Sequence, residues 1–323
     1  MIHLERLSKV FGSRPALHEL SLDIPQGQIF GLLGHNGAGK STTFGMILGQ
    51  VHPTTGAAFI RGVSVQEHRL RALQGVGAIF ETPAFYDYLS GWTNLRIFTS
   101  YTRRLPESEL RETVRFVGLE TRIHDPVRVY SHGMRQRLAL AQALLPRPDL
   151  VLLDEPAEGL DPEGIHEMRH LILRLNREHG MTVILSSHLL SEVEQVCDRI
   201  AVLNQGRMIF EGNWTDLKAD TLRYRLEADP WEQAAAIITK TPGATLAPPG
   251  TANLQIGNST TSAQAERILT LPPGHDIADV VAALVQAGIK VRAVEPLKQS
   301  LEEIYLELVG TPRPATTPRE ACP

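Results

Sequence analysis

The sequence has few cysteines, no excess of basic residues and no long apolar run. Only Cys197 and Cys322 occur in 323 residues, which excludes a disulfide framework and favours a reducing compartment. The formal net charge is −4, from 32 basic and 36 acidic residues, so no nucleic-acid partner is expected. No stretch approaches the roughly 20 apolar residues of a membrane-spanning helix, and the charged N-terminus lacks the apolar core of a signal peptide. These absences predict a cytosolic chain that reaches a membrane only through a partner.

Short apolar runs alternate with helical patterns along residues 1–214, which predicts an α/β domain. The expected strands are Ile2–Leu7, Glu19–Ile24, Gln28–Leu33, Val76–Phe80, Leu150–Asp154, Thr182–Ser186, Ile200–Leu203 and Met208–Glu211. Helical patterns over Trp92–Arg103, Glu107–Val117 and His132–Leu144 interrupt this alternation. We therefore expect a helical subdomain at about residues 82–146, inserted into the α/β domain.

The composition becomes richer in Ala, Thr and Pro after residue 220. The expected elements there are a strand at Arg223–Glu227, a helix at Trp231–Lys240, weak strands near Thr245, Leu254 and Ile268, a helix at Ile277–Ala287, a strand at Lys290–Val294 and a helix at Leu301–Val309. The βαββαβ order suits a small ferredoxin-like α+β domain over residues 220–309. The Pro-rich residues 310–323 are predicted to be a disordered tail.

The stretch GLLGHNGAGKST follows an apolar strand and opens a helix, and it fits the pattern G-x-x-x-x-G-K-[ST]. Glycines allow the loop to wrap its backbone N–H groups around phosphate oxygens, and the helix N-terminus adds its dipole. Lys40 would reach the β- and γ-phosphates, and the Ser41 hydroxyl would bind Mg²⁺. The residues predicted to bind ATP here are Gly34, His35, Asn36, Gly37, Ala38, Gly39, Lys40, Ser41 and Thr42. The alternative is a glycine-rich turn without a ligand, which the strand–loop–helix context disfavours.

A second acidic motif, DLVLLDEP, ends a buried strand in Asp154 and Glu155. Ligands of open α/β sheets bind at the carboxyl ends of the strands. Asp154 suits a Mg²⁺ ligand, and Glu155 suits the general base that polarises the attacking water, a role worth about 10²–10⁴-fold in rate. Two acidic residues that merely end a strand are the alternative, and the phosphate loop argues against it.

With three further motifs the chain resembles the ATP-binding subunit of ABC transporters. Ser131, His132, Gly133 and Met134, in YSHGMRQR, resemble the start of that family's signature motif. EGLDP, with Asp161, resembles its D-loop, and His188, in SSHLLSEVE, resembles its switch histidine. Phe11 stands where the family has an aromatic residue that stacks on adenine. The resemblance covers residues 1 to about 215.

The resemblance implies an ABC-type P-loop NTPase that binds ATP and Mg²⁺ and hydrolyses ATP, with Glu155, His188, Lys40 and Glu81 as catalytic residues. It also implies that two copies of the chain close head to tail on two ATP molecules. Ser131 and the Gly133 N–H would then bind the γ-phosphate of the opposite subunit. Locally, Ser131 also reads as an ordinary helix N-cap, and both roles are compatible. An integral membrane permease on a separate chain would hold the protein at the inner face of the membrane.

The chain departs from the common family pattern at three positions. His132 and Met134 stand where glycine and glutamine are commonest, and Glu81 replaces the glutamine whose loop links Mg²⁺ and water to the membrane partner. Glutamate in that loop resembles bacterial exporters of peptide antibiotics, including lantibiotic and bacitracin self-protection systems. The segment Val294–Val309 resembles the end of drug- and antibiotic-exporter ATPases. Glu81 as a Mg²⁺ ligand therefore stands beside Glu81 as a plain solvated loop residue.

Several other interpretations compete with the transporter subunit. A soluble ABC ATPase of regulatory, translation or repair type usually carries two ATPase units or a long coiled coil, and this chain has one phosphate loop. A small-molecule kinase has no use for the signature helix. The stretch His166–His170 matches the zinc pattern H-E-x-x-H, but an apolar stripe lies on the opposite side of its helix. The aromatics Phe85, Tyr86 and Tyr88 belong either to the core of the helical subdomain or to a contact with the membrane subunit.

Overall fold

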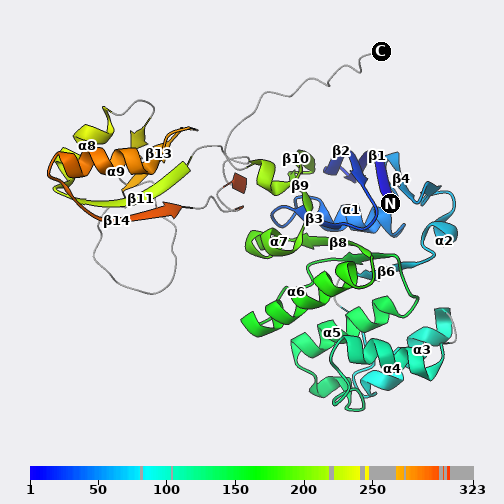
Figure 1. The fold of residues 1–323 in the computed structure, drawn as a ribbon. Coiled ribbons are helices and arrows are strands. Elements are labelled where there is room, and N and C mark those ends of the chain that lie inside the picture. The colour runs from blue at the N-terminus through cyan, green and yellow to red at the C-terminus, as the bar shows by residue number, and fades with distance from the viewer. Residues whose placement is uncertain are drawn as a thin grey trace. The chain divides into compact units, whose positions relative to one another are not determined.

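The computed structural model describes residues 1–80, 83–102, 105–217, 222–240, 244–246, 267–272 and 274–297, together with 301, 304 and 305. Glu81, the predicted strand near Leu254, residues 306–309 of the last predicted helix and the predicted tail 310–323 lie outside the described residues. The chain divides into two compact units (Figure 1). The first unit comprises Met1–Trp214 together with Tyr305, and the second comprises Thr215–Ile304.

The first unit contains a parallel sheet, an antiparallel sheet and a group of helices. Its strands are β1 (Ile2–Phe11), β2 (Arg14–Ile24), β3 (Ile29–Leu33), β4 (Thr55–Ile60), β5 (Val63–Ser64), β6 (Val76–Ile79), β7 (Leu150–Leu153), β8 (Thr182–Ser187), β9 (Arg199–Asn204) and β10 (Arg207–Gly212). Its helices are α1 (Lys40–Ile47), α2 (Arg69–Ala72), α3 (Gly91–Thr102), α4 (Glu107–Phe116), α5 (His132–Leu144), α6 (Pro162–Arg177) and α7 (Leu190–Val196), with a short 3-10 turn at Val127–Val129. A second 3-10 turn, Trp214–Leu217, begins at the last residue of this stretch and continues into the second unit.

The six-stranded sheet has the order β10-β9-β3-β8-β7-β6 and is parallel except for the β9–β10 pair. All residues of β3, β7 and β8 are buried, as expected for strands covered on both faces. Leu33 pairs with Ser187, and Leu153 pairs with Leu185 on the same strand β8. The three segments that follow β3, β7 and β8 therefore leave the sheet at one edge, and they carry the phosphate loop, the two carboxylates and His188.

The antiparallel sheet, β2-β1-β4-β5, shares one apolar core with helix α1 and the parallel sheet. Phe30 and Phe44 are fully buried in it. The strands β1 and β2 form a long hairpin in which Phe11 pairs with Arg14. Phe11 consequently lies at the hairpin tip, where it is 51% exposed.

Helices α3, α4 and α5 gather at one end of the first unit, away from the β1–β2–β4 sheet (Figure 1). They lie between β6 and β7 in sequence, in the stretch where the helical insertion was predicted. Asn94, which is fully buried in α3, bonds both the N–H and the C=O of Tyr86 and the C=O of Ser90. This side-chain amide holds the aromatic loop, Phe85–Tyr88, in front of α3.

The second unit has the element order βαββαβ and its own apolar core. Its elements are β11 (Leu222–Asp229), α8 (Trp231–Ile238), β12 (Thr245–Leu246), β13 (Ile268–Leu271), α9 (Ile277–Gln286) and β14 (Lys290–Leu297). The sheet order is β12-β13-β11-β14 with antiparallel neighbours throughout, the arrangement of a ferredoxin-like fold. None of the helices that the structure describes, in either unit, has the length and apolar character needed to cross a bilayer.

Candidate active site

The phosphate loop connects β3 to α1 and curls around the side chain of Lys40. Gly39 has φ 110°, and a Cβ there would lie 2.9 Å from the Ala16 carbonyl oxygen, so only glycine fits. Lys40 is 5% exposed, and its Nζ donates to the Gly34 carbonyl oxygen at 2.7 Å. No side chain caps the N-terminus of α1, which leaves its first backbone N–H groups available to an anion. The loop combines a buried ammonium group with the uncapped N-terminus of α1.

The carboxylate of Glu155 lies between Lys40 and His188. Its Oε1 is 3.1 Å from the Lys40 Nζ, and its Oε2 is 2.8 Å from the His188 Nδ1. The backbone N–H of His188 also donates to Oε2 at 3.2 Å. Glu155 adopts φ 48°, a left-handed conformation that is uncommon outside glycine and typical of functional sites. The Glu155 carboxylate is thus held at the end of β7 by the Lys40 ammonium group at one oxygen and by the ring and backbone N–H of His188 at the other.

Ser186, fully buried on β8, joins the two acidic residues. Its Oγ accepts a hydrogen bond from the Glu155 N–H at 2.9 Å, and its hydroxyl donates to the Asp154 carboxylate. This bridge orients Asp154 and secures the backbone of Glu155 at the point where it leaves the sheet.

A cavity of about 840 Å³ opens over these groups, within the usual size range for a ligand site of ~300–1,000 Å³. Its lining includes the predicted residues Phe11, Asn36, Gly37, Gly39, Lys40, Ser41, Thr42, His132, Asp154 and Glu155. Gln136 of the signature stretch and Glu158 and Gly159 of the D-loop stretch also line it. Ala16 and Pro83 complete the lining, and no motif had indicated these two. The exposed ring of Phe11, with the Lys9 Nζ 4.9 Å from its centroid, stands at the end of the hairpin where an adenine could stack.

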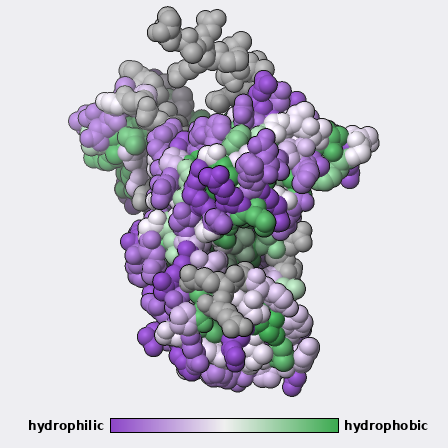
Figure 2. All heavy atoms as spheres, turned by 90° about the vertical axis from the view of Figure 1, so that its right-hand side faces the viewer, coloured by the Kyte–Doolittle hydropathy of each residue, from purple (hydrophilic) through white to green (hydrophobic). Residues whose placement is uncertain are grey.

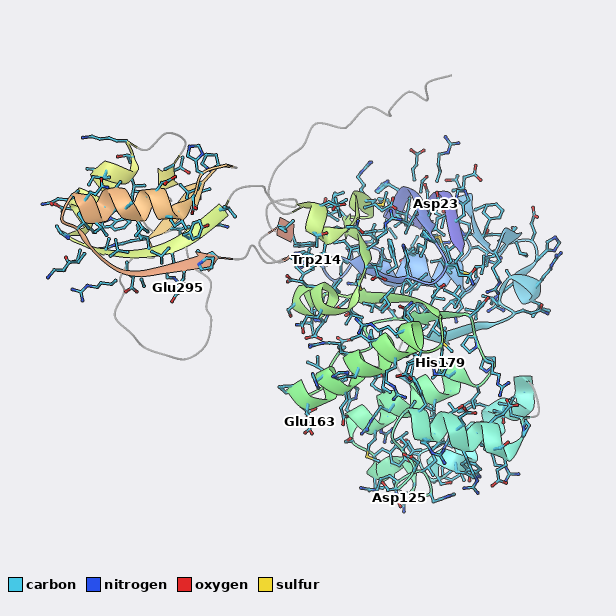
Figure 3. The ribbon with its side chains drawn as sticks, in the orientation of Figure 1. Asp23, Asp125, Glu163, His179, Trp214 and Glu295 are labelled. Atoms are coloured by element: carbon cyan, nitrogen blue, oxygen red, sulfur yellow. The ribbon has the colours of Figure 1, made fainter. Side chains whose placement is uncertain are left out.

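The signature and D-loop motifs lie side by side in the same chain. Ser131 is the N-cap of α5, and its Oγ accepts from the Met134 N–H at 3.2 Å. Asp161 is the N-cap of α6 and accepts from the Gly164 N–H at 2.9 Å. Figure 3 labels Glu163 at this N-terminal end of α6. A second cavity, of about 420 Å³, is lined by both motifs, including Ser131, His132, Gly133 and Asp161. Ser131 therefore fills the local capping role that its position predicts.

The remaining phosphate-loop residues have structural contacts. The buried Ala38 accepts from the Gly206 N–H through its carbonyl oxygen. The His35 ring packs edge-on against the Tyr305 ring, with 5.0 Å between the centroids. Tyr305 is 3% exposed, and burial raises the pKa of its phenol. A residue close to the C-terminus thus touches the phosphate loop.

The chain is similar to known proteins of one family. The profile of the ABC transporter family matches residues 17–158. An uncharacterised ABC transporter ATP-binding protein of Bacillus subtilis is 37% identical over 311 residues, covering 96% of each chain. The chain belongs to the ATP-binding subunits of ABC transporters. It is therefore an ATPase.

Two relatives of this ABC subunit carry named functions. A bacitracin transport ATP-binding protein of Enterococcus faecalis is 31% identical over 96% of both chains. A lantibiotic transport ATP-binding protein of Streptococcus pyogenes is 39% identical over 65% of this chain and 90% of its own. The fold also matches a solved dimeric ATP-binding cassette bound to ADP and phosphate, with a TM-score of 0.60 and 24% identity over 66% of this chain and 98% of that one. The predicted family and its ABC-type P-loop fold are confirmed.

The sequence motifs of this ABC subunit did not predict that Ser186 and Tyr305 contact residues of the site. Ser186 precedes the switch histidine by two residues and lies near the end of β8. This position could have indicated that it lies beside the residues of the site. Tyr305 carries no motif, and only the fold brings it to His35. The histidines of the zinc pattern contact each other through their Nε2 atoms, 3.1 Å apart, while Glu167 faces Arg137 on α5 at 3.6 Å. The carboxylate of that pattern is directed to another helix, away from the two rings.

Proposed function

We propose that this ABC subunit powers the export of a peptide antibiotic through a separate membrane protein. The supporting observation is its similarity along 96% of both chains to a bacitracin transport ATP-binding protein, because this similarity includes the second unit as well as the ATPase. The glutamate at position 81, a feature in which the sequence resembles such exporters, is consistent with this assignment. Through the permease, the subunit would be held at the inner face of the cell membrane.

Mg²⁺ is the metal that the site suits. Ser41 and Asp154 line the same cavity and offer hard oxygen ligands, and Ser186 orients the Asp154 carboxylate. Bound Mg²⁺ would neutralise charge on the β- and γ-phosphates. We propose Glu81 as a third contributor to this metal site.

Glu155 would activate the water that attacks the γ-phosphate. Its ion pair with Lys40 competes with the charge of an incoming triphosphate, because both need the same ammonium group. We propose that phosphate takes over Lys40 and that Glu155, still held by His188, then accepts a proton from the water.

Two copies of the subunit would close head to tail around two ATP molecules. In that arrangement the N-terminus of α5, with Ser131 and the Gly133 N–H, completes the ATP site of the partner. The dipole of α5, which favours the Ser131 cap, would also stabilise a phosphate bound at the same end of the helix.

The aromatic loop in front of α3 is the surface that we assign to the permease. Tyr86 and Tyr88 are 43% and 68% exposed and pack against each other, and Tyr86 also stacks on Phe98. Figure 2 shows one face of the molecule, on which hydrophilic residues predominate and apolar residues are interspersed.

Co-purification tests this function. The full chain, expressed with the membrane protein encoded next to its gene, should stay with that protein through mild detergent extraction. Tyr88→Ser should weaken the association, whereas the matched change Tyr101→Ser, at another exposed tyrosine (78%), should leave it intact. Recovery of the wild-type chain without any membrane polypeptide would contradict the proposal and favour a soluble regulatory ATPase.

A further inference from the structure

His132 of the signature motif forms a direct bridge to the D-loop of its own chain. Its Nε2 lies 2.9 Å from the carbonyl oxygen of Glu158. Its ring also lies over Gly159, where an added Cβ would be 3.3 Å from Nε2. Because a carbonyl oxygen only accepts, the Nε2 atom must carry the proton and donate. A glycine at position 132 could make neither contact.

Glu158 in turn belongs to the tight turn that begins at the general base. Its backbone N–H donates to the Glu155 carbonyl oxygen at 3.1 Å. One residue, Glu158, therefore receives the His132 hydrogen bond through its C=O and gives a hydrogen bond to Glu155 through its N–H. Two hydrogen bonds connect the signature helix to the backbone of the catalytic glutamate.

The turn needs such support because its first residue is strained. Glu155 has φ 48°, a conformation that is strained outside glycine and persists only when its surroundings enforce it. Ser186 secures the start of the turn through the Glu155 N–H, and Asp161 caps the helix that follows. His132 is the side chain that secures the middle of the turn from α5.

We propose that His132 is a positioning residue that holds Glu155 of its own chain in its catalytic conformation. The effect of His132 on coupling between two ATP sites rests on the proposed dimer. There, the N-terminus of α5 contacts the ATP of the partner, whereas the turn from Glu155 to Asp161 serves the ATP of its own chain. His132 then couples the filling of one ATP site to the alignment of the base in the other.

The competing role is a direct contact of the imidazole with the phosphate of the partner's ATP. The structure favours positioning, because Nε2 already donates to Glu158 and the ring packs on Gly159. The two roles differ in which ATP site depends on His132, so they can be separated.

Three substitutions in the full-length chain test positioning. His132→Gln keeps an N–H donor at comparable reach, His132→Phe keeps a ring without a donor, and His132→Ala removes both. We expect kcat for ATP hydrolysis to fall about twofold to tenfold in the Phe and Ala variants, the worth of one neutral hydrogen bond, and to recover in Gln. KM for ATP and the melting temperature should change little in all three. Full activity in His132→Phe, or a Gln variant as slow as Ala, would overturn the proposal.

Mixed dimers assign the dependence to one site. The reference pairs a wild-type copy with a Glu155→Gln copy, purified through two different affinity tags, so that one base is active. Adding His132→Ala to the copy that retains Glu155 should slow hydrolysis about twofold to tenfold relative to this reference. Adding it to the Glu155→Gln copy should leave the rate unchanged. The reverse pattern, or equal rates in both mixed dimers, contradicts positioning within one chain.

Failure of the proposed dimer would look different. If hydrolysis needs no second copy, equimolar mixtures of wild type with Glu155→Gln show half the wild-type rate per total protein at every protein concentration. The comparison of the Gln, Phe and Ala variants still decides the role of His132 in that case.

Discussion

Replacing Glu155 with glutamine removes the proposed general base and keeps its shape. The amide retains an oxygen that can accept the His188 N–H, so the backbone of the turn should hold its place. The change removes the negative charge that lies 3.1 Å from the Lys40 Nζ. We therefore expect hydrolysis to become slower, whereas ATP binding should persist or become tighter.

Hydrolysis should slow by about 10²–10⁴-fold, the usual contribution of a general base, which is a barrier increase of about 3–5 kcal/mol. ATP binding should persist or tighten, because the buried Lys40 has lost its protein counter-charge and the triphosphate supplies one. Removing one partner of a buried ion pair lowers the free energy of unfolding by about 3–5 kcal/mol. Because the Glu155 side chain is 17% exposed, we expect the loss of stability in Glu155→Gln to lie near or below the lower end of this range. ATP should therefore raise the melting temperature of the variant more than that of wild type.

The assay measures phosphate release, the dissociation constant of ATP and the molar mass in solution. The variant should release almost no phosphate, bind ATP, and double its mass when ATP and Mg²⁺ are present. Glu178→Gln is the matched control, because it makes the same chemical change in an exposed pair with Arg174. Wild-type turnover in Glu155→Gln would refute the assignment of the base, and loss of ATP binding would refute the account of Lys40.

Three further changes probe other parts of the site. Ser131→Arg should block hydrolysis while the ATP affinity of the single subunit stays near normal; a large loss of affinity would mean that the signature does not act across two copies. Ser186→Ala leaves the Glu155 N–H without its acceptor and should lower the free energy of unfolding by about 1–3 kcal/mol in urea titrations while also reducing kcat; an unchanged kcat would disconnect Ser186 from catalysis. Tyr305→Ala should weaken ATP binding about twofold to tenfold, because the His35 ring loses an aromatic partner worth about 0.5–1.5 kcal/mol, whereas Tyr305→Phe should bind normally; equal affinities of the two variants would contradict this.

The parts of the site that depend on local chemistry were predictable from the sequence. The phosphate loop needs glycine where backbone approaches backbone, and Gly39 shows this need directly at the Ala16 carbonyl. The buried runs that became β3, β7 and β8 were long and apolar enough to be recognised. Their order along the chain then placed Lys40 and Glu155 at one edge of the sheet.

Elements stabilised by distant partners were less predictable. The strand β1 was expected to end at Leu7, but pairing with β2 extends it through polar residues to Phe11. The strand β4, TGAAFI, has weak β-propensity and was not expected; it forms because β1 pairs with it along most of its length. The bridges from His132 to Glu158 and from His35 to Tyr305 join segments that no local pattern relates.

We propose that ATP hydrolysis at this site drives a peptide antibiotic through a membrane partner. Inside-out membrane vesicles that contain the full chain and the neighbouring membrane protein test it most directly. With ATP, they should accumulate a bacitracin-type peptide, and vesicles with Glu155→Gln should not. Hydrolysis by the wild-type complex without uptake of peptide antibiotics would contradict the claim.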